Sequence, residues 1–179
     1  MRYCISGIAG FLGSHLARRL TAEGHEVAGV DLVYPQGADR LRGIPLTEYH
    51  WGDCGEAVLR IPPVDAIVHC ASVTNIGYSW ANTRGSLLTM GLPIIDILQA
   101  MQQRWAKHLI LISTHSVYGK SAGYPFSETD PTRPTNPYGV LKLLQEQMAL
   151  AYAATFGLKV TVLRMALMYG EHEREDATP

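Results

Sequence analysis

Three glycines stand three residues apart near the start of the chain, at Gly7, Gly10 and Gly13. The mostly apolar segment from Tyr3 to Ser6 before them predicts a strand, and leucines recurring every four residues predict a helix from Phe11 to Glu23. One glycine permits a tight turn, the next lets a phosphate approach the backbone, and the last lets the helix pack against the strand. A strand, a glycine turn and a helix in this order favour a nucleotide-binding βα unit.

Strands and helices are predicted to alternate along the rest of the chain. Such alternation favours an α/β fold whose parallel sheet carries helices on both faces. The segment from 119 to 137 carries four prolines and is predicted to be a long loop. The further predicted strands are Glu26–Asp31, Thr47–Trp51, Ala66–Cys70, His108–Ser113 and Lys159–Arg164, and the further helices are Pro93–Arg104 and Tyr138–Phe156.

Composition excludes several classes of function. The chain has 179 residues, enough for one well-buried domain, and its net charge of -1 favours neither a nucleic-acid nor a membrane surface. No leader sequence is recognised, and no apolar run approaches the ~20 residues of a membrane span. Cys4, Cys54 and Cys70 form no paired motif, so we interpret them as reduced thiols of a cytoplasmic protein. The seven histidines show no zinc-ligand spacing, and no metal is expected.

Asp31 ends the second predicted strand, about 20 residues after the glycine turn. A carboxylate at this position can accept hydrogen bonds from an adenosine ribose. Because it would repel a 2′-phosphate, Asp31 favours NAD over NADP as the cofactor. Taken alone, the same residue could equally be a helix cap or a turn residue.

Tyr138 and Lys142 stand four residues apart, on one face of the long predicted helix. A phenol with a pKa near 10 is a poor base at neutral pH, but a nearby ammonium and an oxidised nicotinamide both favour the phenolate. Tyr138 could then take a proton from a substrate hydroxyl, and Lys142 could also hold the nicotinamide ribose. Thr114 and Ser116 follow the predicted strand His108–Ser113, where ligands bind in open α/β sheets.

Together the glycine turn, Asp31, "HCA", "STHSVYG", the proline-rich loop and "YGVLK" closely resemble the extended short-chain dehydrogenase/reductase superfamily. The similarity is to its NAD-dependent sugar-nucleotide epimerase/dehydratase family and runs from Met1 to about Gly170. It implies a doubly wound, parallel-sheet Rossmann domain over residues 1–170. It also implies that residues 171–179 are a charged tail at the start of a truncated substrate lobe, so that the chain alone could be inactive.

The resemblance assigns roles to individual residues. Thr114, Tyr138 and Lys142 would form the catalytic triad, with Ser116 beside the substrate. The backbone of Phe11 and Leu12 would meet the pyrophosphate. The remaining cofactor contacts would come from Asp53 and Cys54 at the adenine and from Cys70, Ala71 and Ser72 beside the cofactor.

The same resemblance helps to choose the reaction. Dehydratases of the family carry an Asp-Glu pair after the catalytic Thr, and decarboxylating members generally carry a Glu at the second position. This chain has His115 and Ser116 there. The favoured reaction is therefore epimerisation of a nucleotide sugar, possibly at carbon 4, in which a sugar hydroxyl is oxidised, the keto-sugar turns over and hydride returns to its other face.

Two departures from the family pattern keep alternatives open. Met90 stands where the family commonly has an Asn, and Leu167 stands where an Asn contacts the substrate. A net NAD-dependent dehydrogenase of a sugar or other alcohol, and a catalytically silent NAD-binding domain, therefore remain alternatives. The long helix is apolar over most of its circumference, and the family dimerises through it, which implies a homodimer formed by helices 93–104 and 138–156.

Overall fold

A computed structural model describes residues 1–120 and 125–171 and contains a six-stranded parallel sheet. The strand order is β3-β2-β1-β4-β5-β6, so β1 lies between β2 and β4 and the order reverses beside it. This is the doubly wound Rossmann arrangement that the sequence predicts. The strands are β1 Arg2–Ser6, β2 Glu26–Asp31, β3 Glu48–Trp51, β4 Ala66–His69, β5 His108–Thr114 and β6 Lys159–Met165.

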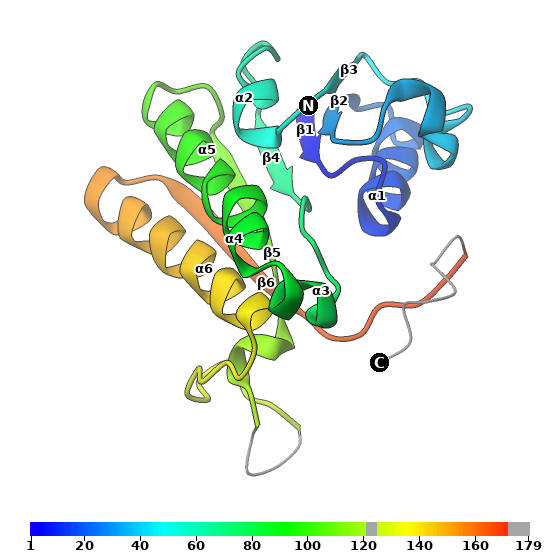
Figure 1. The fold of residues 1–179 in the computed structure, drawn as a ribbon. Coiled ribbons are helices and arrows are strands. Elements are labelled where there is room, and N and C mark those ends of the chain that lie inside the picture. Colours follow the sequence, from blue (N-terminus) through cyan, green and yellow to red (C-terminus); the bar gives the residue numbers. More distant parts are fainter. Residues whose placement is uncertain (121–124, 172–179) are drawn as a thin grey trace.

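Helices cover both faces of the sheet (Figure 1). Helix α1 lies on one side, whereas α2, α5 and α6 lie on the other, with α5 and α6 in contact along their lengths. The predicted tail 171–179 lies outside the described residues except for Glu171. The helices are α1 Phe11–Ala22, α2 Cys54–Val58, α3 Ile76–Ala81, α4 Thr83–Ser86, α5 Pro93–Gln102 and α6 Pro137–Phe156; a π-helical segment spans Leu87–Gly91, and 3₁₀ turns span Pro35–Gly37, Asp39–Leu41 and His115–Tyr118.

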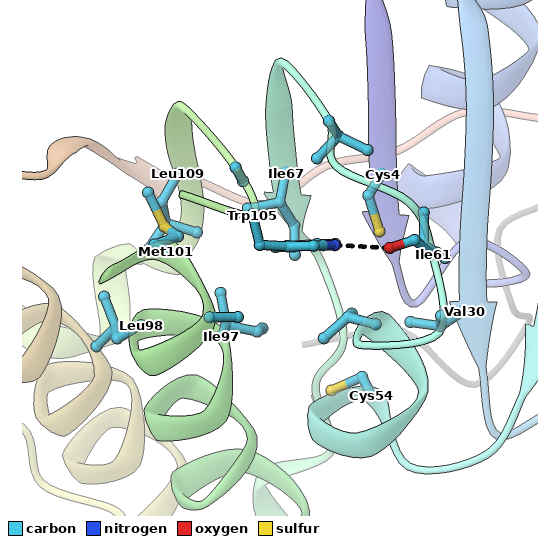
Figure 2. Packing of buried hydrophobic residues seen from close by; sticks show 14 of the residues in the cluster. Cys4, Val30, Cys54, Ile61, Ile67, Ile97, Leu98, Met101, Trp105 and Leu109 are labelled. Atoms are coloured by element: carbon cyan, nitrogen blue, oxygen red, sulfur yellow. Dashed lines mark hydrogen bonds between the residues drawn. The ribbon is translucent and has the colours of Figure 1, made fainter. Parts of the chain in front are cut away.

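The larger hydrophobic core lies between the sheet and the α2–α5–α6 layer. Figure 2 shows Trp105 at its centre, among aliphatic residues of α5 and the strands. The indole N–H of Trp105 donates to the backbone carbonyl of Ile61 at 2.7 Å, so the buried ring leaves no unpaired donor. A second cluster, with Ile5, Val27 and Ile112, lies under α1. The two clusters fix the sheet between its helix layers.

The short helices α2, α3 and α4 are absent from the sequence prediction. Each is too short to show a helical period, but each begins at a capping residue: the side chains of Asp53, Asn75 and Asn82 accept hydrogen bonds from backbone N–H groups of the first turn. The predicted helix Pro93–Arg104 ends at Gln102, because Arg104 adopts a left-handed backbone with φ of 62°. Caps were thus the signal that could have located these helices.

The membrane and cysteine expectations can be compared with the described residues. None of the helices described is both long and apolar enough to span a bilayer. Cys4, Cys54 and Cys70 are all free thiols.

Candidate functional site

The glycine turn is packed so tightly that two of its glycines have no room for a side chain. Gly7 has a φ of 71° and donates to Val30 at 2.8 Å, which joins the end of β1 to β2. A Cβ on Gly7 would lie 2.7 Å from the backbone nitrogen of Ala71. A Cβ on Gly13 would collide with the carbonyl oxygen of Gly7 and lie 2.7 Å from the Cα of Ile8. Gly13 therefore lets α1 pack against the turn, and Gly7 lets the turn pack against the segment that follows β4.

Gly10 has a different environment. Among the described residues, a Cβ there would meet only the carbonyl oxygen of Gly7, at 3.1 Å. Gly10 is the N-cap of α1 and, as a glycine, supplies no side-chain acceptor to the first turn. The N–H groups of Phe11 and Leu12 in that turn lack intrahelical acceptors, and the positive end of the helix dipole adds to their attraction for an anion. This turn, called the cradle below, therefore has the backbone donors and the positive helix end that a phosphate group requires.

Asp31 connects the end of β2 to this cradle. Its Oδ2 accepts from the backbone N–H of Ala9 at 2.8 Å, and its Oδ1 accepts from the N–H of Val33 at 3.0 Å. A carboxylate has about four lone-pair sites, so Asp31 retains capacity to accept from a ribose. These two hydrogen bonds correspond to the turn role that the sequence left open. The remaining lone pairs leave the carboxylate able to bind a ribose.

Asp53 and Cys54 lie at the start of α2, after the end of β3. Asp53 caps α2 by accepting from the N–H of Gly55 at 2.9 Å. The Cys54 side chain belongs to the larger core, and burial raises the pKa of its thiol to about 12. The side chain of Cys54 therefore has a packing role, and only its backbone remains available to an adenine.

Cys70, Ala71 and Ser72 continue from β4 past the start of the glycine turn. The N–H of Cys70 donates to the backbone of Ser6 at 3.0 Å, and burial raises the pKa of the Cys70 thiol to about 12. The buried Ser72 hydroxyl has no hydrogen-bond partner of normal geometry among the described residues. An unpaired polar group in this position suits contact with a ligand or an ordered water.

Tyr138 and Thr114 approach one another from α6 and β5. Asn136 caps α6 by accepting from Gly139 at 2.8 Å, which places Tyr138 in the first turn of the helix. Tyr138 is only 9% exposed. Burial raises the pKa of its phenol, whereas the nearby hydroxyls of Thr114 and Ser72 lower it. Two hydroxyls thus support the phenolate that a general base requires.

Lys142 is buried one turn further along α6. Its Nζ donates to the backbone carbonyl of Ile112 at 2.9 Å, and burial lowers the pKa of its ammonium to about 8. An ammonium with this pKa is still mostly protonated at neutral pH, so Lys142 keeps the positive charge that its predicted roles require.

Sequence reasoning missed a buried polar network behind the site. The Nδ1 of His69 lies 2.7 Å from the Ser6 hydroxyl, and the side-chain nitrogen of Gln145 donates to the carbonyl of Met90 at 2.6 Å. Gln145 also reaches His69, at 3.5 Å. Burial, followed by the charge of Lys142, lowers the pKa of His69 to about 3 and keeps it neutral. The network joins β1, β4, α6 and the π-helical segment.

The two departures from the expected pattern lie in different surroundings. Met90 is fully buried and packs with Tyr138 and Leu141, so it fills space behind the phenol. Leu167 is exposed, after the end of β6. Ser116 lies in the turn after β5, where its N–H donates to the Thr114 hydroxyl at 3.2 Å.

Comparison with known proteins gives consistent results. A sequence model of the "NAD dependent epimerase/dehydratase family" matches residues 3–179. The chain is 30% identical to Protein CapI of Staphylococcus aureus, covering 98% of this chain and 57% of the relative. It is also 30% identical to a UDP-glucose 4-epimerase of Lactobacillus helveticus, covering 92% of this chain and 51% of that protein. The chain thus spans slightly more than half the length of these relatives.

Solved structures show the same relationship. The crystal structure of the UDP-glucuronic acid 4-epimerase of Bacillus cereus, in complex with UDP-glucuronic acid and NAD, matches with a TM-score of 0.85 and 26% identity. The match covers 98% of this chain and 60% of that chain.

Proposed function

The chain belongs to the NAD-dependent epimerase/dehydratase family, and we propose that it binds NAD and inverts a hydroxyl of a UDP-linked sugar at carbon 4. The main support is one juxtaposition: the phosphate cradle at the end of β1 shares a sheet edge with Tyr138 and Thr114 at the end of β5. Ligands of open α/β sheets bind at this edge, beside the point where the strand order reverses. The 4-epimerase activity of the relatives supports the choice of reaction.

The residues present fit NAD. Gly10 leaves the backbone of α1 open to a pyrophosphate, and Asp31 has lone pairs free for the adenosine ribose. The buried hydroxyl of Ser72 stands beside Tyr138, where the nicotinamide end would lie. Lys142 would hold the nicotinamide ribose. When bound, NAD supplies the acceptor and donor of a hydride.

The chain's own residues carry the proton chemistry. As a phenolate, Tyr138 takes the proton of the sugar hydroxyl at its Oη and later returns it to the re-formed hydroxyl. Thr114 hydrogen-bonds the same hydroxyl and keeps it within reach of the phenol. Burial raises the pKa of Tyr138, so the phenolate is the minor form at neutral pH. Its fraction grows as the pH rises, and the rate of the oxidative step is expected to rise with it.

The two kinds of glycine give a paired test of the cradle. A methyl group in Gly10→Ala would occupy the open side of the turn, so NAD affinity is expected to fall at least roughly tenfold, while the free energy of unfolding changes by less than about 1 kcal/mol. Gly13→Ala forces backbone atoms apart and is expected to cost about 2 kcal/mol or more. Calorimetric titration and urea unfolding measure both; a fully stable Gly10→Ala protein with unchanged NAD affinity would exclude this cradle.

Asp31 tests the choice of cofactor. Replacing Asp31 with Ser removes the charge that repels a 2′-phosphate, so the ratio of NADP to NAD affinity is expected to rise by roughly tenfold, or about 1.4 kcal/mol. Asp39, an exposed carboxylate paired with Arg42, provides the matched control. An Asp31→Ser protein with the preference of the wild type, measured by calorimetric titration, would mean that the ribose binds elsewhere.

A catalytically silent NAD-binding domain is the second candidate, favoured by the exposed Leu167 and the apolar Met90 at positions where the family has Asn. Incubation with a UDP-sugar and NAD distinguishes the candidates. An inverted sugar with no accumulated NADH supports the epimerase, and NADH with an oxidised sugar supports a net dehydrogenase. NAD binding without turnover supports the silent domain.

We also propose that the chain forms a homodimer through α6 and the segment before α5. Apolar residues of α5 itself, such as Ile94 and Leu98, are buried in the core, so the exposed face lies earlier than the sequence predicts. Leu87 and Leu144 both lie close to Gly91, so the segment before α5 and helix α6 meet there. To this proposed interface, the leucine face, we assign five exposed residues: Leu87, Leu88, Leu92, Val140 and Leu144.

Charge in the leucine face tests this interface. Leu88→Glu is expected to convert a dimer to a monomer in sedimentation equilibrium, because a carboxylate would be buried without a partner. Leu59→Glu, at an exposed position after α2, should leave the dimer intact. A wild-type chain that stays monomeric at micromolar concentrations would refute the dimer.

A further inference from the structure

Two aromatic side chains of β3 hold the backbone that follows Asp31. The hydroxyl of Tyr49 donates to the carbonyl of Val33 at 2.5 Å, and the indole N–H of Trp51 donates to the carbonyl of Leu32 at 3.0 Å. Tyr34, the next residue of the same segment, packs edge-on against Trp51 with ring centroids 5.2 Å apart. Side chains of the edge strand β3 thus hold the segment after β2 in place.

Of these two hydrogen bonds, the one from Tyr49 is connected to the Asp31 carboxylate through a further hydrogen bond. Val33, whose carbonyl accepts from Tyr49, also donates its N–H to Oδ1 of Asp31 at 3.0 Å. Oδ2 of Asp31 accepts from Ala9 in the glycine turn at 2.8 Å. Hydrogen bonds therefore run without a break from Tyr49 through Val33 and Asp31 to Ala9. Trp51 donates to Leu32, and within the part of the chain that the structure describes the backbone donors to the Asp31 carboxylate are Ala9 and Val33, not Leu32.

The surroundings of Tyr49 restrict its side chain and keep its hydroxyl protonated. It is half-buried and packs against the smaller core under α1, so its hydroxyl has little freedom. Burial, and then the charge of Asp31, raise the pKa of Tyr49 to about 12. The phenol consequently remains a hydrogen-bond donor throughout the pH range in which a protein of this kind is studied.

From this connection we infer that Tyr49 is a positioning residue for the cofactor: by fixing Val33 it sets the direction in which Asp31 presents its free lone pairs to the adenosine ribose. The inference rests on the proposed binding of NAD. It assigns to β3, an edge strand with no predicted role, part of the affinity for the ribose hydroxyls.

The test compares two substitutions that each remove one hydrogen bond from the same segment. Tyr49→Phe is expected to weaken NAD binding by about fivefold in calorimetric titration, the effect of one partly exposed hydrogen bond. Trp51→Phe removes the bond to Leu32 and should change the affinity by less than about twofold. Both proteins should melt within a few degrees of each other.

The ribose contact is isolated by a second cofactor and a second variant. With an NAD analogue that lacks the adenosine 2′-hydroxyl, the loss caused by Tyr49→Phe should shrink toward twofold or less. In an Asp31→Asn background, Tyr49→Phe should add little further loss, since coupled residues are not additive. If Tyr49 had only a structural role, Tyr49→Phe would instead weaken the binding of both cofactors equally, and its effect would be independent of Asp31.

The outcomes separate this inference from the proposed function. If the wild-type chain binds no NAD, the proposed function fails. If the wild type binds NAD and Asp31→Asn weakens it, but Tyr49→Phe and Trp51→Phe behave alike, the cofactor site stands and the role of Tyr49 is refuted.

Discussion

Replacing Tyr138 with Phe is expected to lower the rate of sugar oxidation at least about 100-fold, the usual contribution of a positioned general base. The substitution removes only the hydroxyl and keeps the ring that packs against Met90 and Leu141. NAD affinity should therefore stay within about twofold of the wild type. The rate is measured in a single turnover, as near-ultraviolet absorbance of NADH when a UDP-sugar is mixed with the NAD-loaded protein.

A second tyrosine of the same helix serves as the control. Tyr152 packs against the larger core and lies far along α6 from Thr114, so Tyr152→Phe should retain the wild-type rate. Thr114→Val should cause an intermediate loss, because it removes one of the two hydroxyls that favour the phenolate. An active Tyr138→Phe protein would show that another group accepts the proton.

The second large effect concerns stability. Glu146 is fully buried in α6 and pairs with Arg164 of β6 at 2.7 Å, while the hydroxyl of Ser113 in β5 also donates to it. Arg164 further donates to the Tyr118 hydroxyl at 2.9 Å and lies over its ring. Three elements therefore depend on one carboxylate.

Glu146→Met keeps the length and helix propensity of the side chain but leaves Arg164 and Ser113 without their shared acceptor. Removal of one partner from a buried ion pair costs about 3–5 kcal/mol, and the partly exposed guanidinium places this case near the lower value. Urea unfolding should show a loss of about 3 kcal/mol. Glu23→Met, in an exposed pair with Arg19, should change stability by less than about 1 kcal/mol.

Equal stability of two variants would contradict the role given to this ion pair. If Glu146→Met were as stable as Glu23→Met, the ion pair would not connect α6 to β6 in solution. A double replacement of Glu146 and Arg164 by apolar residues should recover much of the loss, because it leaves no unpaired charge in the core.

The sequence predicted the features that depend on local pattern. Periodic apolar residues located the strands and long helices, and the spacing of Gly7, Gly10 and Gly13 located the tight turn between β1 and α1. The residues Tyr138 and Thr114 were predicted together from resemblance, and the fold does bring them to one edge of the sheet.

The features that sequence reasoning missed depend on contacts distant in the chain. Nothing local to His69 or Gln145 shows that they meet behind the site, 76 positions apart. The direction of Lys142 is likewise set by the carbonyl of Ile112 on another element. Spacing on a helix places Lys142 on the same face as Tyr138, but burial and the nearest acceptor decide where its ammonium points.

A crystal structure of the chain grown with NAD tests the central claim most directly. The account predicts phosphate oxygens at the N–H groups of Phe11 and Leu12, the adenosine ribose on Asp31, and the nicotinamide ring within contact distance of the Tyr138 hydroxyl. A pyrophosphate bound away from Gly10, or a nicotinamide that does not reach Tyr138, would contradict it.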